Sequence, residues 1–103
     1  MSRWVKFTTL DRLPPGSALE VDYDGRIYAL FHAQDGKISV IDGICAHQGG
    51  PLAEGKLDGP VVTCPWHGWQ FDMRTGRSLI HKSVCVAIFE VKVEGDDVYV
   101  MVP

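Results

Sequence analysis

The stretch CAHQGGPLAEGKLDGPVVTCPWH, residues 45–67, organises the whole of this 103-residue chain. It opens with Cys45 and His47 and closes with Cys64 and His67, so each end supplies one thiolate and one imidazole. Soft sulfur ligands and borderline nitrogen ligands, paired twice, suit a transition metal. We therefore predict that Cys45, His47, Cys64 and His67 bind metal.

The spacing within the first pair bears on which metal is bound. Structural zinc sites usually separate their paired ligands by two or more residues, whereas a single residue separates Cys45 from His47. This spacing suits two adjacent metal ions better than one tetrahedral ion. A two-iron cluster, in which one iron takes the two cysteines and the other takes the two histidines, meets that requirement. A structural zinc site in a binding module is the alternative.

The two ligand boxes resemble those of the Rieske [2Fe–2S] family. Cys45-Ala46-His47 matches the C-x-H box of that family, and Cys64-Pro65-Trp66-His67-Gly68-Trp69 matches its C-x-x-H box. The distance between the boxes, Phe71 and the Thr75-Gly76 pair also resemble the family, over nearly the whole chain. The resemblance implies one Rieske-type [2Fe–2S] cluster as cofactor. It also implies that both cysteines hold an inner iron and both histidines hold an outer iron, towards solvent.

The chain differs from the respiratory, high-potential members of this family. Those members carry an extra cysteine in each loop, joined as a disulfide, where Gly50 and Trp66 stand here. They also carry a Ser and a Tyr that donate hydrogen bonds to sulfur, where this chain has Trp69 and Phe71. The resemblance therefore implies a cluster of low potential. Residues 79–82 lack the proline that many oxygenase-associated relatives have near the cluster.

Short apolar segments separated by turns indicate an all-β fold. We expect strands over residues 4–8, 18–23, 26–33, 37–41, 85–93 and 98–102, turns at 13–16, 24–25, 35–36, 75–76 and 95–97, and a helical turn near 52–54. The odd positions from Cys85 to Val93 are apolar, so Cys85 is expected in the core. His32 and His81 are expected to be structural or solvated.

The chain is therefore expected to be a single domain, residues 1–103, built as a small antiparallel sandwich or barrel. The Rieske resemblance implies in addition that two loops, at about residues 43–56 and 64–69, form a cluster-binding tip inserted between strands. Trp66 and Leu52 lie beside the ligands in the sequence, so we expect them to shield the cluster or to form the docking rim for a partner.

The sequence shows no substrate machinery of its own, so we expect a protein that is not an enzyme by itself. It has no Gly-rich dinucleotide fingerprint after a strand, no second metal site for oxygen activation and no Ser-His-Asp set. The resemblance implies a one-electron carrier, the Rieske-type ferredoxin of a bacterial ring-hydroxylating oxygenase system. Its expected partners are a flavin-dependent ferredoxin reductase and a terminal oxygenase.

Two other proteins with the same domain are alternatives. One is the small subunit of an assimilatory nitrite reductase, which a neighbouring gene for a large sirohaem reductase would indicate. The other is the N-terminal domain of a longer oxygenase, although Met1 and the end after Val102-Pro103 favour a complete chain.

Composition sets limits on partners and location. The formal net charge is −3 and no basic patch is visible, which disfavours nucleic acid. No apolar stretch approaches the length of a membrane span. Two of the three cysteines are assigned to metal, so no disulfide pair is left, and this favours a reducing cytoplasm. We expect a monomer that meets its partners transiently.

Overall fold

The structure is a computed structural model that describes residues 2–44, 51–66, 68–81 and 83–103. Its strands are β1 (Arg3–Thr9), β2 (Ala18–Tyr23), β3 (Arg26–His32), β4 (Ile38–Asp42), β5 (Lys56–Asp58), β6 (Val61–Thr63), β7 (Gln70–Asp72), β8 (Ile88–Phe89), β9 (Val91–Glu94) and β10 (Asp97–Val102). Short 3-10 helices are η1 (Leu10–Arg12) and η2 (Leu52–Glu54). No helix among the described residues is long and apolar enough to cross a membrane. The predicted all-β class is confirmed.

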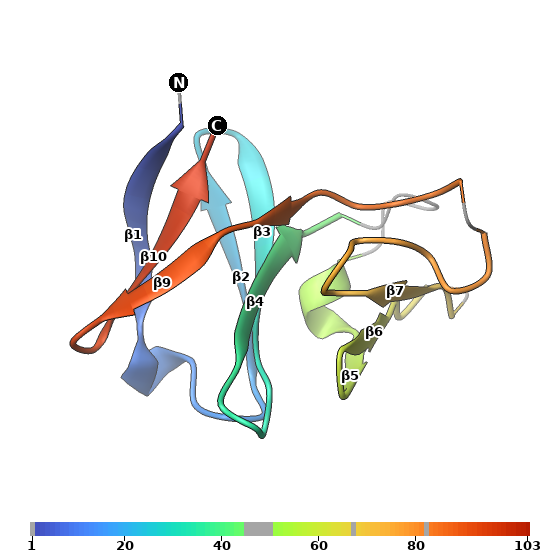
Figure 1. Ribbon diagram of the computed structural model, residues 1–103, viewed down its shortest axis with the longest axis horizontal. Helices are drawn as coiled ribbons and strands as arrows, with labels where there is room; N and C mark the ends of the chain where they lie inside the picture. Colours follow the sequence, from blue (N-terminus) through green and yellow to red (C-terminus); the bar gives the residue numbers. More distant parts are fainter. Residues whose placement is uncertain (1, 45–50, 67, 82) are drawn as a thin grey trace.

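Two antiparallel sheets form the larger lobe, on the left of Figure 1. One sheet has the order β1-β10-β9 and the other the order β2-β3-β4-β8. The two ends of the chain lie side by side because β1 pairs antiparallel with β10, with Arg3 opposite Val102. The buried side chains of this core are Leu13, Tyr28, Leu30, Val40, Val98, Val100 and Val102.

Strand β3 is buried on both faces, so its side chains contribute to both hydrophobic cores of the molecule. Tyr28 and Leu30 belong to the core of the larger lobe, whereas Ala29 and Phe31 belong to a second core on the opposite face of the sheet. A strand with both faces covered has an apolar run instead of a clean polar alternation. The sequence of β3, RIYALFH, has this character.

The smaller lobe, on the right of Figure 1, is an insertion between β4 and β8. It contains η2 and a sheet with the order β5-β6-β7. The second core is shared between this lobe and the strands β3 and β4, so the lobe is fixed to the sandwich by apolar burial. Its buried members are Ala29, Phe31, Ile41, Leu52, Val62, Cys64, Phe71, Met73 and Val86.

Most of the predicted strands agree with the observed ones to within one or two residues. The Asp24-Gly25 turn is a close hairpin, because Asp24 and Gly25 have φ of +53° and +79° and Tyr23 pairs with Arg26. The helical turn expected near 52–54 is η2. Helix η1 and strand β5 were not expected, because each has only three residues and no apolar periodicity.

The expectation that Cys85 lies in the core is wrong. Its side chain is exposed, and its neighbour Val86 is buried instead. The segment 85–93 is not one strand, since β8 begins only at Ile88 and ends before Glu90. Upstream of β8, the backbone N–H of Val86 donates to the carbonyl oxygen of Gly76 at 2.7 Å. Because of this contact with the preceding turn, Val86 faces the core and Cys85 faces solvent, the opposite of the expected arrangement.

The same contact makes Gly76 sensitive to substitution. Gly76 has φ of +80°, and an added Cβ would overlap the carbonyl oxygen of Val86. We expect Gly76→Ala to lower the free energy of unfolding by about 2–4 kcal/mol, because the left-handed conformation and the overlap both act against the folded state. Urea unfolding followed by fluorescence measures this loss.

Gly25 provides the matched control. Its φ is +79°, and no described atom outside its own chain neighbours lies within 4 Å of an added Cβ. Gly25→Ala should therefore lose only about 1–2 kcal/mol, the conformational part alone. Equal losses in the two variants would show that the Val86 contact contributes nothing.

Candidate metal centre

Cys64 follows β6 directly and is buried, with 1% of its surface exposed. It belongs to the core of the smaller lobe, next to residues that come from β3, β4 and β7. The other three predicted ligands, Cys45, His47 and His67, lie outside the described residues. The structure therefore describes one predicted ligand and the framework on either side of the others.

A tight turn holds Cys64 in place. The backbone N–H of Cys64 donates to the carbonyl oxygen of Trp69 at 2.7 Å, which closes the turn. The backbone N–H of Trp66 points at the Cys64 sulfur, with a nitrogen–sulfur distance of 3.4 Å. Gly68 has φ of +73°, which glycine adopts without steric strain.

This turn suits a cysteine that acts as a ligand. A backbone N–H that donates to sulfur stabilises the thiolate, and the thiolate is the form that binds metal. Burial excludes water from the sulfur and from the bonds that it makes. The donor set of two thiolates and two imidazoles in the two boxes, together with this turn, fits a [2Fe–2S] cluster.

The two flanks of the first ligand box are held together at their base. The backbone N–H of Gly43 donates to the carbonyl oxygen of Ile27, and that of Leu52 donates to the carbonyl oxygen of Gly43, both at 2.9 Å. Ile44 and Pro51 form an antiparallel bridge. The end of β4 and the start of η2 are thus tied to each other and to β3, a restraint that local sequence does not reveal.

A third segment packs beside the second ligand box. The backbone N–H of Leu79 donates to the carbonyl oxygen of Gln70 in β7, at 3.0 Å. The hydroxyl of the buried Ser78 accepts the backbone N–H groups of Ile80 and His81, at 3.3 and 3.1 Å. These bonds give residues 78–81 a defined turn although the segment has no proline.

His81 ends this turn and contacts the second ligand box directly. Its ring is stacked on the indole of Trp69, with centroids 4.2 Å apart and planes at 17°. Trp69 also lies near the ring of Phe71, which is completely buried. Phe71 belongs to the core of the smaller lobe, and Trp69 packs partly buried against the same core.

Exposed apolar side chains lie on the segments that border this framework. The exposed fractions are 38% for Ile44, 49% for Trp66, 49% for Leu79 and 64% for Ile80. Trp66 is thus exposed, as a rim residue must be, whereas Leu52 is completely buried and its predicted place in a docking rim is wrong. Leu79 and Ile80 were missed, although two consecutive apolar residues in a predicted loop were the available signal.

His32 is structural, as one of the two outcomes expected for it. It ends β3, has 9% of its surface exposed, and its Nδ1 lies 2.7 Å from the carbonyl oxygen of Leu13. Because a carbonyl only accepts, Nδ1 carries the proton and donates it in this bond. The ring ties the end of β3 to the turn before β2.

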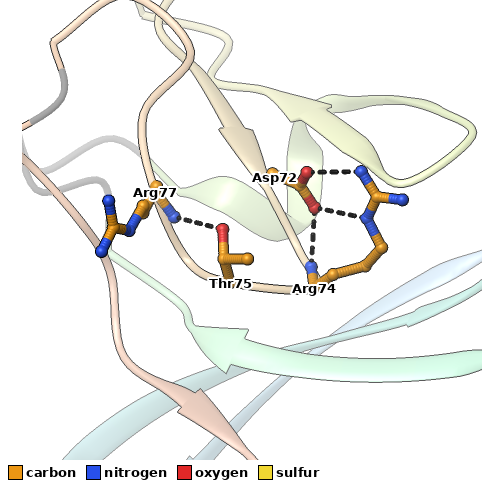
Figure 2. Close-up of polar contacts among 4 residues, drawn as sticks. All are labelled: Asp72, Arg74, Thr75 and Arg77. Carbon is orange, nitrogen blue, oxygen red and sulfur yellow. Dashed lines mark hydrogen bonds and ion pairs between the residues drawn. The ribbon is translucent and has the colours of Figure 1, made fainter.

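An ion pair stabilises the turn that follows β7, as Figure 2 shows. The guanidinium of Arg74 donates to the two carboxylate oxygens of Asp72 at 3.0 and 2.8 Å. The backbone N–H of Arg74 donates to Oδ1 of Asp72 at 2.9 Å. Oγ1 of Thr75 accepts the backbone N–H of Arg77 at 3.2 Å in the same turn. The turn leads the chain from the second ligand box to residues 78–81.

The bonds from the Arg74 side chain, and then from its backbone N–H, lower the pKa of Asp72 below its usual value. A carboxyl whose pKa is lower in the folded state stabilises that state above the pKa of the unfolded chain. The stabilisation is lost as the pH falls through the lowered, folded value. The turn therefore keeps this ion pair throughout the neutral and mildly acidic range.

Comparison with known proteins identifies the family. Residues 3–90 match the model of the Rieske [2Fe-2S] domain. The chain is 35% identical to the biphenyl dioxygenase ferredoxin subunit of Pseudomonas sp. (strain KKS102), over 94% of this chain and 90% of that protein. It is 31% identical to the ferredoxin component of the naphthalene 1,2-dioxygenase system of Pseudomonas aeruginosa, over 95% and 94%.

Longer relatives contain a similar region. The chain is 37% identical to cholesterol 7-desaturase nvd 1 of Ciona intestinalis over 67% of its own length, but it spans only 15% of that protein. The match to the desaturase therefore concerns one region of a much longer chain.

Solved structures have the same fold. A chain of the complex of reduced oxygenase and oxidized ferredoxin in carbazole 1,9a-dioxygenase superposes with a TM-score of 0.84 and 31% identity, over 94% of this chain and 91% of that one. A structure assigned as a nitrite reductase small subunit of Mycobacterium tuberculosis superposes with a TM-score of 0.91 at 22% identity, over 100% and 97%. The chain belongs to the Rieske [2Fe–2S] domain family, and its cofactor is a Rieske-type [2Fe–2S] cluster.

Proposed function

We propose that this protein is a one-electron carrier, a Rieske-type ferredoxin that takes electrons from a flavin-dependent reductase and passes them to a terminal oxygenase. The proposal rests on the similarity to the ferredoxin components of dioxygenase systems. The aligned region spans almost the whole of this chain and almost the whole of each of those proteins. The bound cluster supplies reversible one-electron chemistry. The protein supplies the ligands, the shielding and the docking surface.

Within this function we propose Cys45, His47, Cys64 and His67 as the ligands, the two cysteines on one iron and the two histidines on the other. The buried Cys64 sulfur with its backbone N–H donor supports this assignment. We propose that residues of about 43–56 and 64–69 form the two cluster-binding loops of a single domain over residues 1–103. The tied flanks of the first box support the first loop.

We further propose that the protein works as a monomer in the cytoplasm. The exposed thiol of Cys85 supports a reducing compartment, because an exposed thiol persists there without oxidation. Sedimentation analysis of the purified protein at several concentrations tests the monomer.

Reconstitution tests the electron-transfer function. The purified protein is combined with the flavin-dependent reductase and the terminal oxygenase encoded near it, and formation of hydroxylated product is followed. We expect turnover to depend on this protein and to saturate as its concentration rises. Equal turnover with and without it would contradict the proposal.

The nitrite reductase small subunit is a second candidate, and the fold similarity to the Mycobacterium tuberculosis structure favours keeping it. A reductase subunit would form a stable complex, whereas a carrier meets its partners transiently over a small interface. Co-purification with a large sirohaem subunit, without any effect on an oxygenase, would replace our proposal with this one.

We predict that the exposed apolar side chains near the site form the docking surface for the oxygenase. Ile80 is 64% exposed, so Ile80→Gln removes apolar area that a partner would cover without adding charge. The second-order rate of electron transfer to the oxygenase should fall about 5- to 30-fold, which corresponds to roughly 1–2 kcal/mol of lost burial. Stopped-flow mixing of reduced protein with oxidised oxygenase measures this rate.

Val93 provides the control for docking. It is also apolar and 43% exposed, but it lies on β9 in the larger lobe. Val93→Gln should leave the transfer rate unchanged. A slower rate in the Val93 variant than in the Ile80 variant would place the docking surface on the larger lobe.

A further inference from the structure

The second ligand box, which contains Cys64, and the third segment, residues 78–81, are in contact through the side chain of Trp69. The second ligand box ends in Trp69, whose carbonyl oxygen accepts the backbone N–H of Cys64 at 2.7 Å. The indole of the same Trp69 is stacked on His81 from the third segment. Trp69 is therefore in contact with the ligand turn through its backbone and with His81 through its ring.

The third segment is arranged so that His81 meets the indole. The buried hydroxyl of Ser78 accepts the backbone N–H of His81, and the carbonyl oxygen of His81 accepts the backbone N–H of Val84 at 2.9 Å. Hydrogen bonds thus hold both the backbone N–H and the carbonyl oxygen of His81. Val84 also packs against the core that contains Cys64.

We propose that His81 is a positioning residue for the cluster site. By stacking on Trp69 it holds the third segment against the second ligand box, keeps the turn around Cys64 closed and excludes water from that side of the cluster. The inference rests on the ligand role of Cys64 in the proposed function. It assigns His81 no bond to metal and no part in proton transfer.

The stacking geometry favours the flat ring as the functional part of His81. The ring planes are nearly parallel, and two planar groups at this separation make contact over a large area. The side chain of His81 is otherwise exposed. A residue that serves only to fill a core would be buried, so the position of this ring is better explained as a cover over the indole.

The test uses the purified protein with its cluster and two variants at this position. His81→Gln removes the flat ring and keeps a polar side chain, whereas His81→Phe keeps a flat ring and removes the imidazole. Two quantities are measured: the rate at which an iron chelator bleaches the visible absorbance of the cluster, and the midpoint potential.

We expect His81→Gln to release iron about 2- to 10-fold faster, the factor that corresponds to the loss of one ring contact. Its midpoint potential should rise, because the reduced cluster carries one more negative charge and water stabilises that form. His81→Phe should match the unchanged protein in both measurements. Ser83→Ala, two residues away on an exposed position of the same segment and outside the stack, should match it as well.

Several outcomes would overturn the proposal. One is a His81→Gln variant that keeps both the release rate and the potential, even if it unfolds at lower temperature, because the role would then be structural only. Another is a His81→Phe variant that behaves like His81→Gln, or that fails to take up the cluster, because the flat ring would then not be the cause. Uptake of cluster by His81→Phe but not by His81→Gln would support the proposal.

These measurements separate this inference from the proposed function. If the unchanged protein shows no [2Fe–2S] absorbance and no iron, the proposed ligand set fails. If it shows both and the His81 variants are unaffected, only the positioning role of His81 fails. Neither measurement requires a reductase or an oxygenase.

Discussion

Replacement of Cys64 by serine is expected to abolish the [2Fe–2S] cluster. The Cys64 sulfur is buried and faces the backbone N–H of Trp66, so no water can take its place and no other thiol lies in this turn. The unchanged protein should contain two irons and two acid-labile sulfides per chain, whereas Cys64→Ser should contain almost none. Iron and sulfide analysis, together with the electron paramagnetic resonance spectrum of the reduced protein, measures the loss.

Cys85 supplies the matched control within the same chain. Its thiol is exposed, so Cys85→Ser should keep the whole cluster and change the free energy of unfolding by no more than about 0.5 kcal/mol. Loss of the cluster in Cys85→Ser, with the fold retained, would show that the ligands are misassigned. One zinc per chain without sulfide in the unchanged protein would contradict the iron cluster itself, and such a protein would be colourless.

The second large effect concerns the midpoint potential of the cluster. We expect it near the low end of the range for Rieske centres, which is about −150 to +300 mV. The family resemblance places Trp69 and Phe71 where high-potential members have hydroxyl groups that donate to sulfur. The structure shows the Phe71 ring completely buried in the core that contains Cys64.

The size of the effect follows from the energies of the missing bonds. Each hydrogen bond to sulfur stabilises the more negative, reduced state, and a bond to a charged group contributes about 1.5–3 kcal/mol. Since about 59 mV corresponds to a tenfold change in the equilibrium constant of a one-electron couple, two such bonds amount to more than roughly 100 mV. A low potential suits donation of electrons to an oxygenase.

Protein-film voltammetry measures this potential, and two variants refine the test. Phe71→Tyr adds a hydroxyl to the core that contains Cys64 and should raise the potential. Phe89→Tyr adds the same hydroxyl on β8, in contact with the core of the larger lobe, and should leave it unchanged. A midpoint above about +100 mV in the unchanged protein would contradict both the low potential and the oxygenase assignment built on it.

Much of the fold could be predicted because its signals are local. The Asp24-Gly25 turn and the strands on either side of it follow from φ preferences and β propensity, and the structure shows them at the expected residues. Where the chain passes between the lobes, the prediction was wrong. Val86 is buried and Cys85 is exposed because the backbone N–H of Val86 donates to the carbonyl oxygen of Gly76. Alternation within one strand cannot indicate such a contact between segments.

The family and its cofactor were evident from the sequence by itself. The two ligand boxes are short, and each can be recognised without knowledge of the rest of the fold. The ligand roles of Cys45, His47 and His67 stay predictions, since these residues lie outside the described part of the chain.

Only the tertiary structure decided what surrounds the ligand boxes. Leu52, next to the first box in the sequence, is completely buried, whereas Ile80, far from it in the sequence, is 64% exposed beside the second box. The stack of His81 on Trp69 likewise joins two segments that have no local relation. The family could be recognised from spacing along the chain, because the candidate ligands are few and chemically distinct. Burial, shielding and docking depend on which segments meet in space, and packing of the smaller lobe on β3 and β4 determines that.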